Sequence, residues 1–372
     1  MKRHVFLIPG FFGFANLGDF TYWGPVHHKL GELLAKAGKP AEIHCVKSLP
    51  TASLRARTRC LAETVARVRP GSGAVIHLIG HSTGGLDARL FLTPAVGLQT
   101  GIDVERLARK VRSSVSVATP HLGAPIASFF TGLLGRKLLR VLSVMTMAAL
   151  RRGELPLSAW ARMAGLFAVG PTFSSASGTL ATQLYRQLLT DFNAERREQV
   201  NQLLGEVERD QSLLTQLTVE TMDLFNAAAG NRSDVLYGSV ITRARPPGLE
   251  SAREIGFSPA DQAQQALYAS LSRLSAGYDF PQPGPDVKRA LRKAFGEVPD
   301  SAANDGIVPT LSQPWGQCIA AARADHLDII GHHGGGDAED HYDWLMTRSD
   351  FRREQFDDVW QDVADFLVES EG

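Results

Sequence analysis

Cysteine is scarce in this sequence: only Cys45, Cys60 and Cys318 occur among 372 residues. Three cysteines so widely spaced do not make a disulfide framework or a cysteine-based metal cluster. Cys45 and Cys60 could pair in an exported protein, but we expect buried free thiols. The fold must therefore depend on a hydrophobic core.

An excess of charge of one sign is also missing, because 39 basic residues balance 39 acidic ones. This balance gives no electrostatic attraction toward nucleic acid or an anionic surface, so we expect no nucleic-acid partner. No apolar run is long enough for a transmembrane helix. The hydrophobic share of 44% and the charged share of 21% are ordinary for a globular protein.

A signal peptide is not evident either, although Met-Lys-Arg and an apolar stretch through Phe14 resemble one superficially. No small-residue cleavage site follows that stretch. We therefore expect a first strand there and a cytoplasmic protein, or a secreted one if a leader preceded this chain.

Short apolar runs alternate with helical spacing from residue 4 to residue 125. This alternation predicts an α/β fold with a doubly wound, mostly parallel sheet. The predicted strands are 4–8, 41–46, 74–79, 111–118, 235–242 and 317–322, and the predicted helices include 25–37, 54–68, 86–91, 213–229, 261–274 and 355–368.

The strand signal disappears between residues 126 and 230, which predicts a large helical cap with a further helix at 184–207. The core would then comprise 1–125 and 231–372, with a second cap insertion at about 243–299.

Within the cap, residues 133–150 place Leu138, Val141, Leu142 and Met145 on one helical face. This helix either packs on the core or acts as a mobile lid that binds an interface.

The most informative segment is Gly80-His81-Ser82-Thr83-Gly84, between the predicted strand 74–79 and the predicted helix 86–91. A G-x-S-x-G motif in a strand–turn–helix context is typical of a nucleophile elbow. Such a turn strains the backbone of Ser82, and the flanking glycines supply the space that it needs. The pattern predicts Ser82 as a nucleophile.

A serine nucleophile needs a base, and the base needs an orienting carboxylate. In α/β-hydrolases these follow in the order Ser, Asp or Glu, His. Asp305, in the turn 304–309, and His326, in the loop after the last predicted strand, have that order. The other histidines either precede the serine, lie in strands, precede a suitable acid or follow the last strand at a distance.

The loop after the first strand combines Pro9-Gly10 with many aromatic residues up to Trp23. It is either an aromatic-packed turn or the apolar wall of a pocket. In the second case, its glycines would let backbone N–H groups face a ligand.

Five short motifs occur in register: Pro-Gly-Phe-Phe-Gly-Phe, Gly-His-Ser-Thr-Gly-Gly, Ala-Thr-Pro-His-Leu-Gly, Asn-Asp-Gly-Ile-Val-Pro and Asp-His-Leu-Asp. Together they resemble bacterial triacylglycerol lipases of the α/β-hydrolase fold, over roughly 4–125 and 235–330. The resemblance implies Ser82 as nucleophile, Asp305 as acid and His326 as base. It also implies an oxyanion hole formed by the N–H groups of Phe11 and Thr83. The residues expected to bind substrate are Phe12, Phe14, Trp23, His121 and Leu122.

The sequence departs from these lipases in the oxyanion loop, where Pro9 replaces their usual histidine and Ala15 their frequent aspartate. We therefore expect Arg57, on the helix that follows, to hold this loop instead.

The resemblance also suggests a structural calcium ion, because Asp328 lies two residues after His326 and Asp286 precedes Asp305. Calcium takes six or more oxygens, so Asp328 is alternatively an ordinary loop carboxylate. His332, His333, Asp337 and His341 could suggest zinc, but their glycine-rich context favours a flexible surface loop.

The sequence as a whole predicts a serine carboxylic-ester hydrolase that requires no cofactor and acts on hydrophobic esters, possibly at a lipid–water interface. Its large cap favours a lipase over a small esterase. Two alternatives stay open: a depolymerase of aliphatic polyesters, and a catalytically idle lipid-binding protein. The acyl length, the natural substrate and the oligomeric state are left undetermined.

Overall fold

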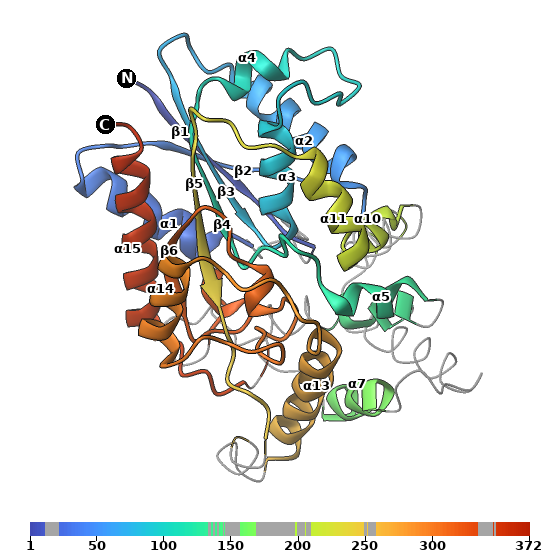
Figure 1. Ribbon diagram of the computed structural model, residues 1–372. Helices are drawn as coiled ribbons and strands as arrows, with labels where there is room; N and C mark the ends of the chain where they lie inside the picture. Colours follow the sequence, from blue (N-terminus) through green and yellow to red (C-terminus); the bar gives the residue numbers. More distant parts are fainter. Residues whose placement is uncertain are drawn as a thin grey trace.

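The computed structural model describes residues 1–11, 22–132, 157–168, 210–248, 258–333 and 347–372, with isolated residues and short pieces between these ranges. Its centre is a six-stranded sheet between layers of helices, with both chain termini near one end (Figure 1). Every helix of the described part is too short or too polar to cross a bilayer.

All neighbouring strands of the sheet are parallel, in the order β2-β1-β3-β4-β5-β6. The strands are β1 Arg3–Ile8, β2 Glu42–Cys45, β3 Val75–His81, β4 Val111–Val117, β5 Leu236–Thr242 and β6 Gln317–Ala322. This arrangement confirms the predicted doubly wound fold, and the predicted strands agree with it to within two residues at each end.

The helices include α1 and α2 before the elbow, α3 directly after it, and α15 near the C-terminus. Their bounds are α1 Gly24–Lys36, α2 Leu54–Val68, α3 Thr83–Leu92, α4 Val104–Ala108, α5 Pro125–Thr131, α7 Leu157–Ala168, α10 Ser212–Gln216, α11 Val219–Ala228, α13 Pro259–Ser275, α14 Pro285–Phe295 and α15 Arg353–Glu369, with 3₁₀ turns η1 Thr310–Ser312 and η2 Asp328–Ile330.

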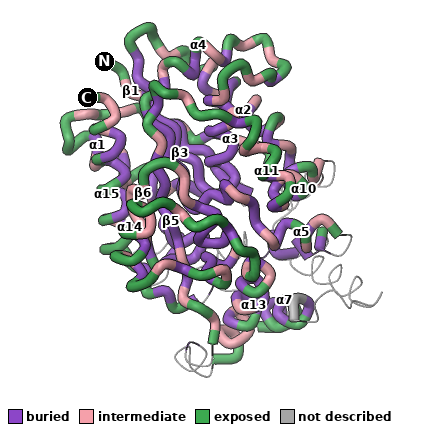
Figure 2. The backbone as a smooth tube through the Cα atoms, viewed as in Figure 1, coloured by how far each residue is buried: buried purple, intermediate pink, exposed green. Residues whose placement is uncertain are grey.

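Alternate residues of β1 face the two helical layers. Val5 and Leu7 belong to the apolar cluster that contains residues of α1 and α15. Phe6 and Ile8 belong to the cluster that contains residues of α2 and α3. Because both faces are covered, β3 is buried along its whole length (Figure 2), which explains its continuous apolar sequence.

The sequence predicted one continuous helix at 213–229, and this prediction was wrong. The structure has two helices there, α10 and α11. Thr218 has an extended backbone with ψ 151° between them. The carbonyl of Leu217 accepts a hydrogen bond from the N–H of Ala124 at 2.9 Å. The Leu217 carbonyl therefore bonds to Ala124 and not to a residue of α11, and α10 and α11 are separated at Leu217 and Thr218.

The cap is described only in part, and the predicted helix 184–207 lies outside the described residues. Leu138, Val141, Leu142 and Met145 are all buried, and they belong to the large apolar cluster that also contains residues of α5, α7 and α13. Burial of this face is required both for a core helix and for a closed lid. The division into a core and a helical cap stays a prediction.

Candidate active site

The predicted elbow lies at the carboxyl end of the central strand β3. Ser82 stands between β3 and α3, with φ 55° and ψ −129°. This conformation is costly for a residue with a side chain. A Cβ on Gly80 would lie 2.3 Å from the backbone carbon of Gly84, and one on Gly84 would lie 2.2 Å from the carbonyl oxygen of Ile8. The two glycines are therefore required by close backbone contacts.

Ser82, His326 and Asp305 come from three distant parts of the chain and lie within hydrogen-bond distance of one another. His326 Nε2 is 3.0 Å from Ser82 Oγ, and His326 Nδ1 is 2.8 Å from Asp305 Oδ2. All three are buried. A carboxylate only accepts, so Nδ1 donates to Asp305, and in a neutral ring Nε2 is left to accept from the Ser82 hydroxyl.

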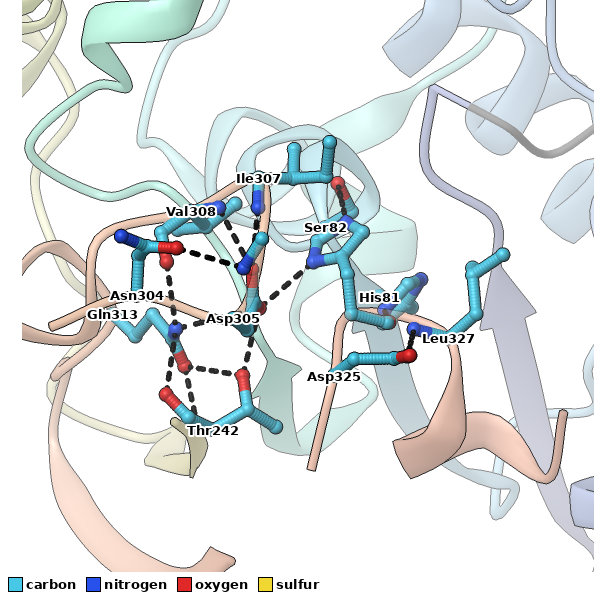
Figure 3. A network of polar contacts seen from close by, with 12 residues as sticks. His81, Ser82, Thr242, Asn304, Asp305, Ile307, Val308, Gln313, Asp325 and Leu327 are labelled. Carbon is cyan, nitrogen blue, oxygen red and sulfur yellow. Dashed lines mark hydrogen bonds and ion pairs between the residues drawn. The ribbon is translucent and has the colours of Figure 1, made fainter. Parts of the chain in front are cut away.

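The Asp305 carboxylate is held by donors on both oxygens (Figure 3). Oδ2 accepts from the hydroxyl of Thr242 at 2.7 Å. Oδ1 accepts from the N–H groups of Ile307 at 3.1 Å and Val308 at 2.7 Å. Its backbone carbonyl also accepts from the N–H of His326 at 3.0 Å. These contacts fix the orientation of the Asp305 carboxylate and its position relative to the His326 imidazole.

Phe11 and Thr83, the predicted oxyanion residues, both line a cavity beside Ser82. A Cβ on Gly10 would lie 2.5 Å from Ser82 Cβ, so this loop runs against the serine. Thr83 is the first residue of α3, where N–H groups have no partner within the helix and the helix end is partially positive. The predicted substrate residues Phe12 and Phe14 lie outside the described residues.

The cavity lining is almost entirely apolar. It consists of Phe11, Ser82, Thr83, Pro120, Ala124, Ile126, Ala127, Phe130, Leu139, Leu214, Leu217, Ile307 and Val308. An acyl chain could lie there next to the serine hydroxyl.

The structure does not bring the other predicted substrate residues to this cavity. Trp23 packs edge-on against Trp360 at a ring separation of 6.3 Å. His121 is buried, with Nε2 2.9 Å from the hydroxyl of Ser116. Leu122 packs on a separate apolar cluster.

Arg57 contacts the loop that follows β1, where the sequence predicted an oxyanion hole, and the expected contact of Arg57 with this loop is confirmed. Its Nη2 donates to the carbonyl of Pro9 at 2.7 Å and to Asp87 Oδ2 at 2.7 Å, and its Nη1 donates to the carbonyl of Leu49 at 2.8 Å. The Arg57 and Asp87 side chains are fully buried. Burial raises the pKa of Asp87 to about 6, and the Arg57 guanidinium opposes that increase.

Tyr22 and His81 form a connection that the sequence analysis missed. The Gly10 N–H donates to the Tyr22 oxygen at 3.2 Å, and the Tyr22 hydroxyl contacts His81 Nδ1. His81 Nε2 lies 2.8 Å from the backbone carbonyl of His326. Burial lowers the pKa of His81 well below its usual range, so the ring is neutral and has one N–H.

That proton must be on Nε2, because a carbonyl can only accept, and Nδ1 then accepts from Tyr22. The oxyanion loop, the elbow and the His326 loop are thus linked through two buried side chains. Only the position of His81 beside the serine gave a sequence signal, and no spacing pattern indicates Tyr22 as its partner.

The two aspartates proposed for calcium have different surroundings. Asp328 is buried, and its Oδ2 accepts from the N–H of Asp325 at 2.9 Å. Asp286 is exposed at the start of α14, 3.3 Å from Arg289. These two carboxylates alone do not fit a calcium shell of six or more oxygens. The calcium hypothesis stays a prediction.

The sequence predicted that His332 and His333 lie in a flexible surface loop. This prediction was wrong, because both side chains are buried. His332 Nε2 lies 3.1 Å from the backbone carbonyl of Tyr22, and His333 packs edge-on against Phe351. These contacts hold the start of the segment against the core. Asp337 and His341 lie outside the described residues.

The chain matches no protein-family model and no curated protein sequence. Solved structures do resemble it. EstA from Clostridium botulinum has 19% sequence identity and a TM-score of 0.53, over 99% of this chain and 87% of that one. Lipase 1 from Pelosinus fermentans has 15% identity and a TM-score of 0.51, over 98% of each chain.

The Staphylococcus hyicus lipase has 16% identity and a TM-score of 0.51, over 100% of this chain and 96% of that one. At such identities the likeness concerns the fold. Together with the parallel sheet and the strand–turn–helix at Ser82, it shows that this chain has the α/β-hydrolase fold, in a form shared with bacterial lipases and esterases.

Proposed function

We propose that this chain hydrolyses carboxylic esters of hydrophobic acyl groups through Ser82, His326 and Asp305. The main support is the pair of hydrogen bonds, 3.0 Å and 2.8 Å, that joins the serine hydroxyl to the aspartate through one imidazole. These atoms adjoin an apolar cavity. The same combination of groups activates serine in unrelated hydrolases.

In this mechanism the Ser82 oxygen attacks the ester carbonyl while His326 Nε2 takes its proton. Asp305 keeps the imidazole oriented and stabilises its protonated form. The N–H groups of Phe11 and Thr83 donate to the oxyanion of the tetrahedral intermediate, and losing one such donor typically costs about 10²–10³ in rate.

The imidazolium then gives the proton to the departing alkoxide, which leaves an acyl group on Ser82. His326 next takes a proton from water as the water oxygen attacks the acyl carbonyl. The imidazolium then returns this proton to the Ser82 oxygen as the bond to the acyl group breaks, which releases the acid and restores the serine.

The apolar lining favours an apolar acyl group, because only Ser82 and Thr83 contribute polar side chains to the described wall. Two of the structural neighbours are named lipases, which agrees with water-insoluble esters. Leu139 of the cap lines this cavity and is buried, so a bulky substrate requires the cap to open. Opening would be favoured by a surface that binds the open state better.

Labelling with a fluorophosphonate tests the nucleophile. The wild-type chain should be labelled at Ser82, and Ser82→Ala should not. A catalytically idle lipid-binding protein would leave Ser82 unlabelled, and that result would overturn the proposal. Initial rates on p-nitrophenyl esters from acetyl to palmitoyl, with emulsified triglyceride and a polyester film compared, then determine the substrate class.

A further inference from the structure

A second group of histidine and carboxylate side chains lies at the opposite end of the sheet from Ser82. His4 is the second residue of β1, and Glu42 and His44 lie on the edge strand β2. The parallel register pairs His4 with Glu42 and Phe6 with His44. Paired residues, and residues two apart on one strand, point to the same face of a sheet. The three side chains therefore share one face.

The donor atoms of these side chains are close together. His4 Nδ1 is 3.1 Å from His44 Nε2 and 3.4 Å from Glu42 Oε2. His44 Nε2 is 4.0 Å from the same Glu42 oxygen. These separations leave one point at about 2.1 Å from all three atoms, which is the length of a zinc–imidazole or zinc–carboxylate bond.

The chemistry of the group also suits a transition metal. Two imidazoles and one carboxylate form a ligand set that zinc uses when a fourth position is open to water. A neutral imidazole is the form that binds metal, and the ordinary imidazole pKa of about 6.5 makes that form available at neutral pH. His4 is buried while Glu42 is exposed, so one side of the group is open to solvent.

Two cationic or titratable neighbours face the group. Lys2 Nζ lies 3.1 Å from Glu42 Oε1, the oxygen that is not directed at His4. His27 on α1 acts on His44 through its charge. Lys2 is exposed and bonds the other oxygen, so it does not occupy the point between the three donors.

We propose that His4 Nδ1, His44 Nε2 and Glu42 Oε2 bind Zn²⁺, or a divalent transition metal of similar preference, with water as the fourth ligand. On binding, the metal replaces the hydrogen bond between the two rings. The donor ring shifts its proton to its other nitrogen through solvent, so both rings stay neutral and no group is oxidised or reduced.

Such an ion would join the edge strand β2, which has only four residues, to β1. It would act on stability and not on the chemistry at Ser82. His4 lies four residues before the carboxyl end of β1, or roughly 13 Å along the strand.

The experiment uses the full chain without an affinity tag, after chelation and dialysis. Isothermal titration with ZnCl₂ should give one equivalent of bound metal. A zinc concentration about a hundredfold above Kd should raise Tm by roughly 3–6 °C. Co²⁺ in place of zinc should produce the strong visible absorption of a four-coordinate ion. Ester hydrolysis should be unchanged.

His44→Ala and Glu42→Gln should each weaken binding about tenfold or more and remove the Tm shift, since both lose a direct ligand. His28→Ala is the matched control, because His28 is an exposed histidine on α1 that lies 3.4 Å from Glu32. It should bind zinc like the wild type.

Absence of zinc binding in the wild type overturns the proposal. Binding that survives unchanged in both variants also overturns it and indicates ligands elsewhere. If His44→Ala does not fold, the exposed and isosteric Glu42→Gln decides. None of these outcomes depends on the proposed ester hydrolysis.

Discussion

The two ends of the sheet contain the same kinds of side chain and use them differently. At the carboxyl end, Asp305 and His326 form a linear connection to Ser82 beside an apolar cavity. At the amino end, Glu371 accepts from Arg3 at 2.6 Å and from Lys39 at 3.1 Å, and it lies 3.4 Å from His77. In the proposed function, one histidine–carboxylate pair orients Ser82, and the other belongs to an ion-pair group.

The difference arises from the backbone that follows the strands. After β3 the chain makes a strained turn at Ser82 and enters α3 at once, so Ser82 and Thr83, the first residue of α3, line the same cavity. In the described part of the chain, no strand is directly preceded by a non-glycine residue with a positive φ. We therefore expect changes at the carboxyl end to alter activity with little effect on Tm, and changes at the amino end to do the reverse.

The largest effect should come from Ser82→Ala and His326→Ala. Each should lower kcat/KM on a soluble p-nitrophenyl ester about a thousandfold or more, and the double variant should be little worse because the groups act as a unit. Melting curves should stay close to wild type. Either single variant that keeps more than about a tenth of the activity contradicts the assignment. If Asp325→Asn or Asp328→Asn is worse than Asp305→Asn, the acid is misplaced.

Tyr22→Phe should have an intermediate effect. It removes the hydroxyl that joins the Gly10 N–H to His81, and it leaves buried polar groups unsatisfied at a cost of about 1–3 kcal/mol. We expect kcat to fall about tenfold with KM nearly constant, because the proposed Phe11 donor on this loop acts mainly in the transition state.

Tyr278→Phe, at a half-exposed tyrosine, is the control and should behave as wild type. A Tyr22→Phe variant that loses Tm without any change in kcat would show that the connection is structural only.

At the amino end, Glu371→Gln should lower Tm by roughly 2–6 °C at neutral pH and leave kcat unchanged. Burial by itself raises the pKa of Glu371, but hydrogen bonds from Arg3 and Lys39 outweigh it and bring the pKa to about 2. Because the pKa of Glu371 is lower in the folded chain than the unfolded value of 4.5, its carboxylate stabilises the fold at pH values above 4.5. This contribution to the free energy of unfolding is lost as the pH falls toward 2.

Burial lowers the pKa of His77 to about 4, so acid also removes stability between pH 6.5 and 4. Unfolding by urea across pH 2–7 checks both windows. The Glu371→Gln variant should show a weaker dependence below pH 4.5 than the wild type, while Glu105, whose pKa hydrogen bonds from Arg232 and Arg109 lower to about 2, keeps its own contribution. An unchanged slope there would contradict the assignment.

The smallest expected effect concerns calcium. If Asp328 binds it, EGTA should lower Tm by a few degrees at most, and added calcium should restore it. Measuring this in a Glu42→Gln background separates calcium from zinc. Asp328→Asn should abolish the response, and a flat melting curve up to millimolar calcium would leave Asp328 as a loop carboxylate.

Local patterns were sufficient to predict much of this molecule. The strands were identifiable because burial on both faces demands continuous apolar runs, as in β3. The serine turn was identifiable because close backbone contacts at positions 80 and 84 leave no room for a Cβ atom, so both residues must be glycine. The chain order of Asp305 and His326 after Ser82 followed the usual order of α/β-hydrolases, without any knowledge of distances.

Only the tertiary structure decided which side chains from distant segments meet. It placed Trp23 and His121 away from the cavity, joined Tyr22 to His81 across 59 residues, and brought His4 to His44 across 40 residues. The His4–His44 contact depends on strand order and register, and the others depend on how loops and helices pack on the sheet. Neither kind of contact is recorded by a local periodicity. The sequence therefore determined the elements and the strained turn at Ser82, while strand pairing and the packing of loops and helices on the sheet determined which side chains surround that turn.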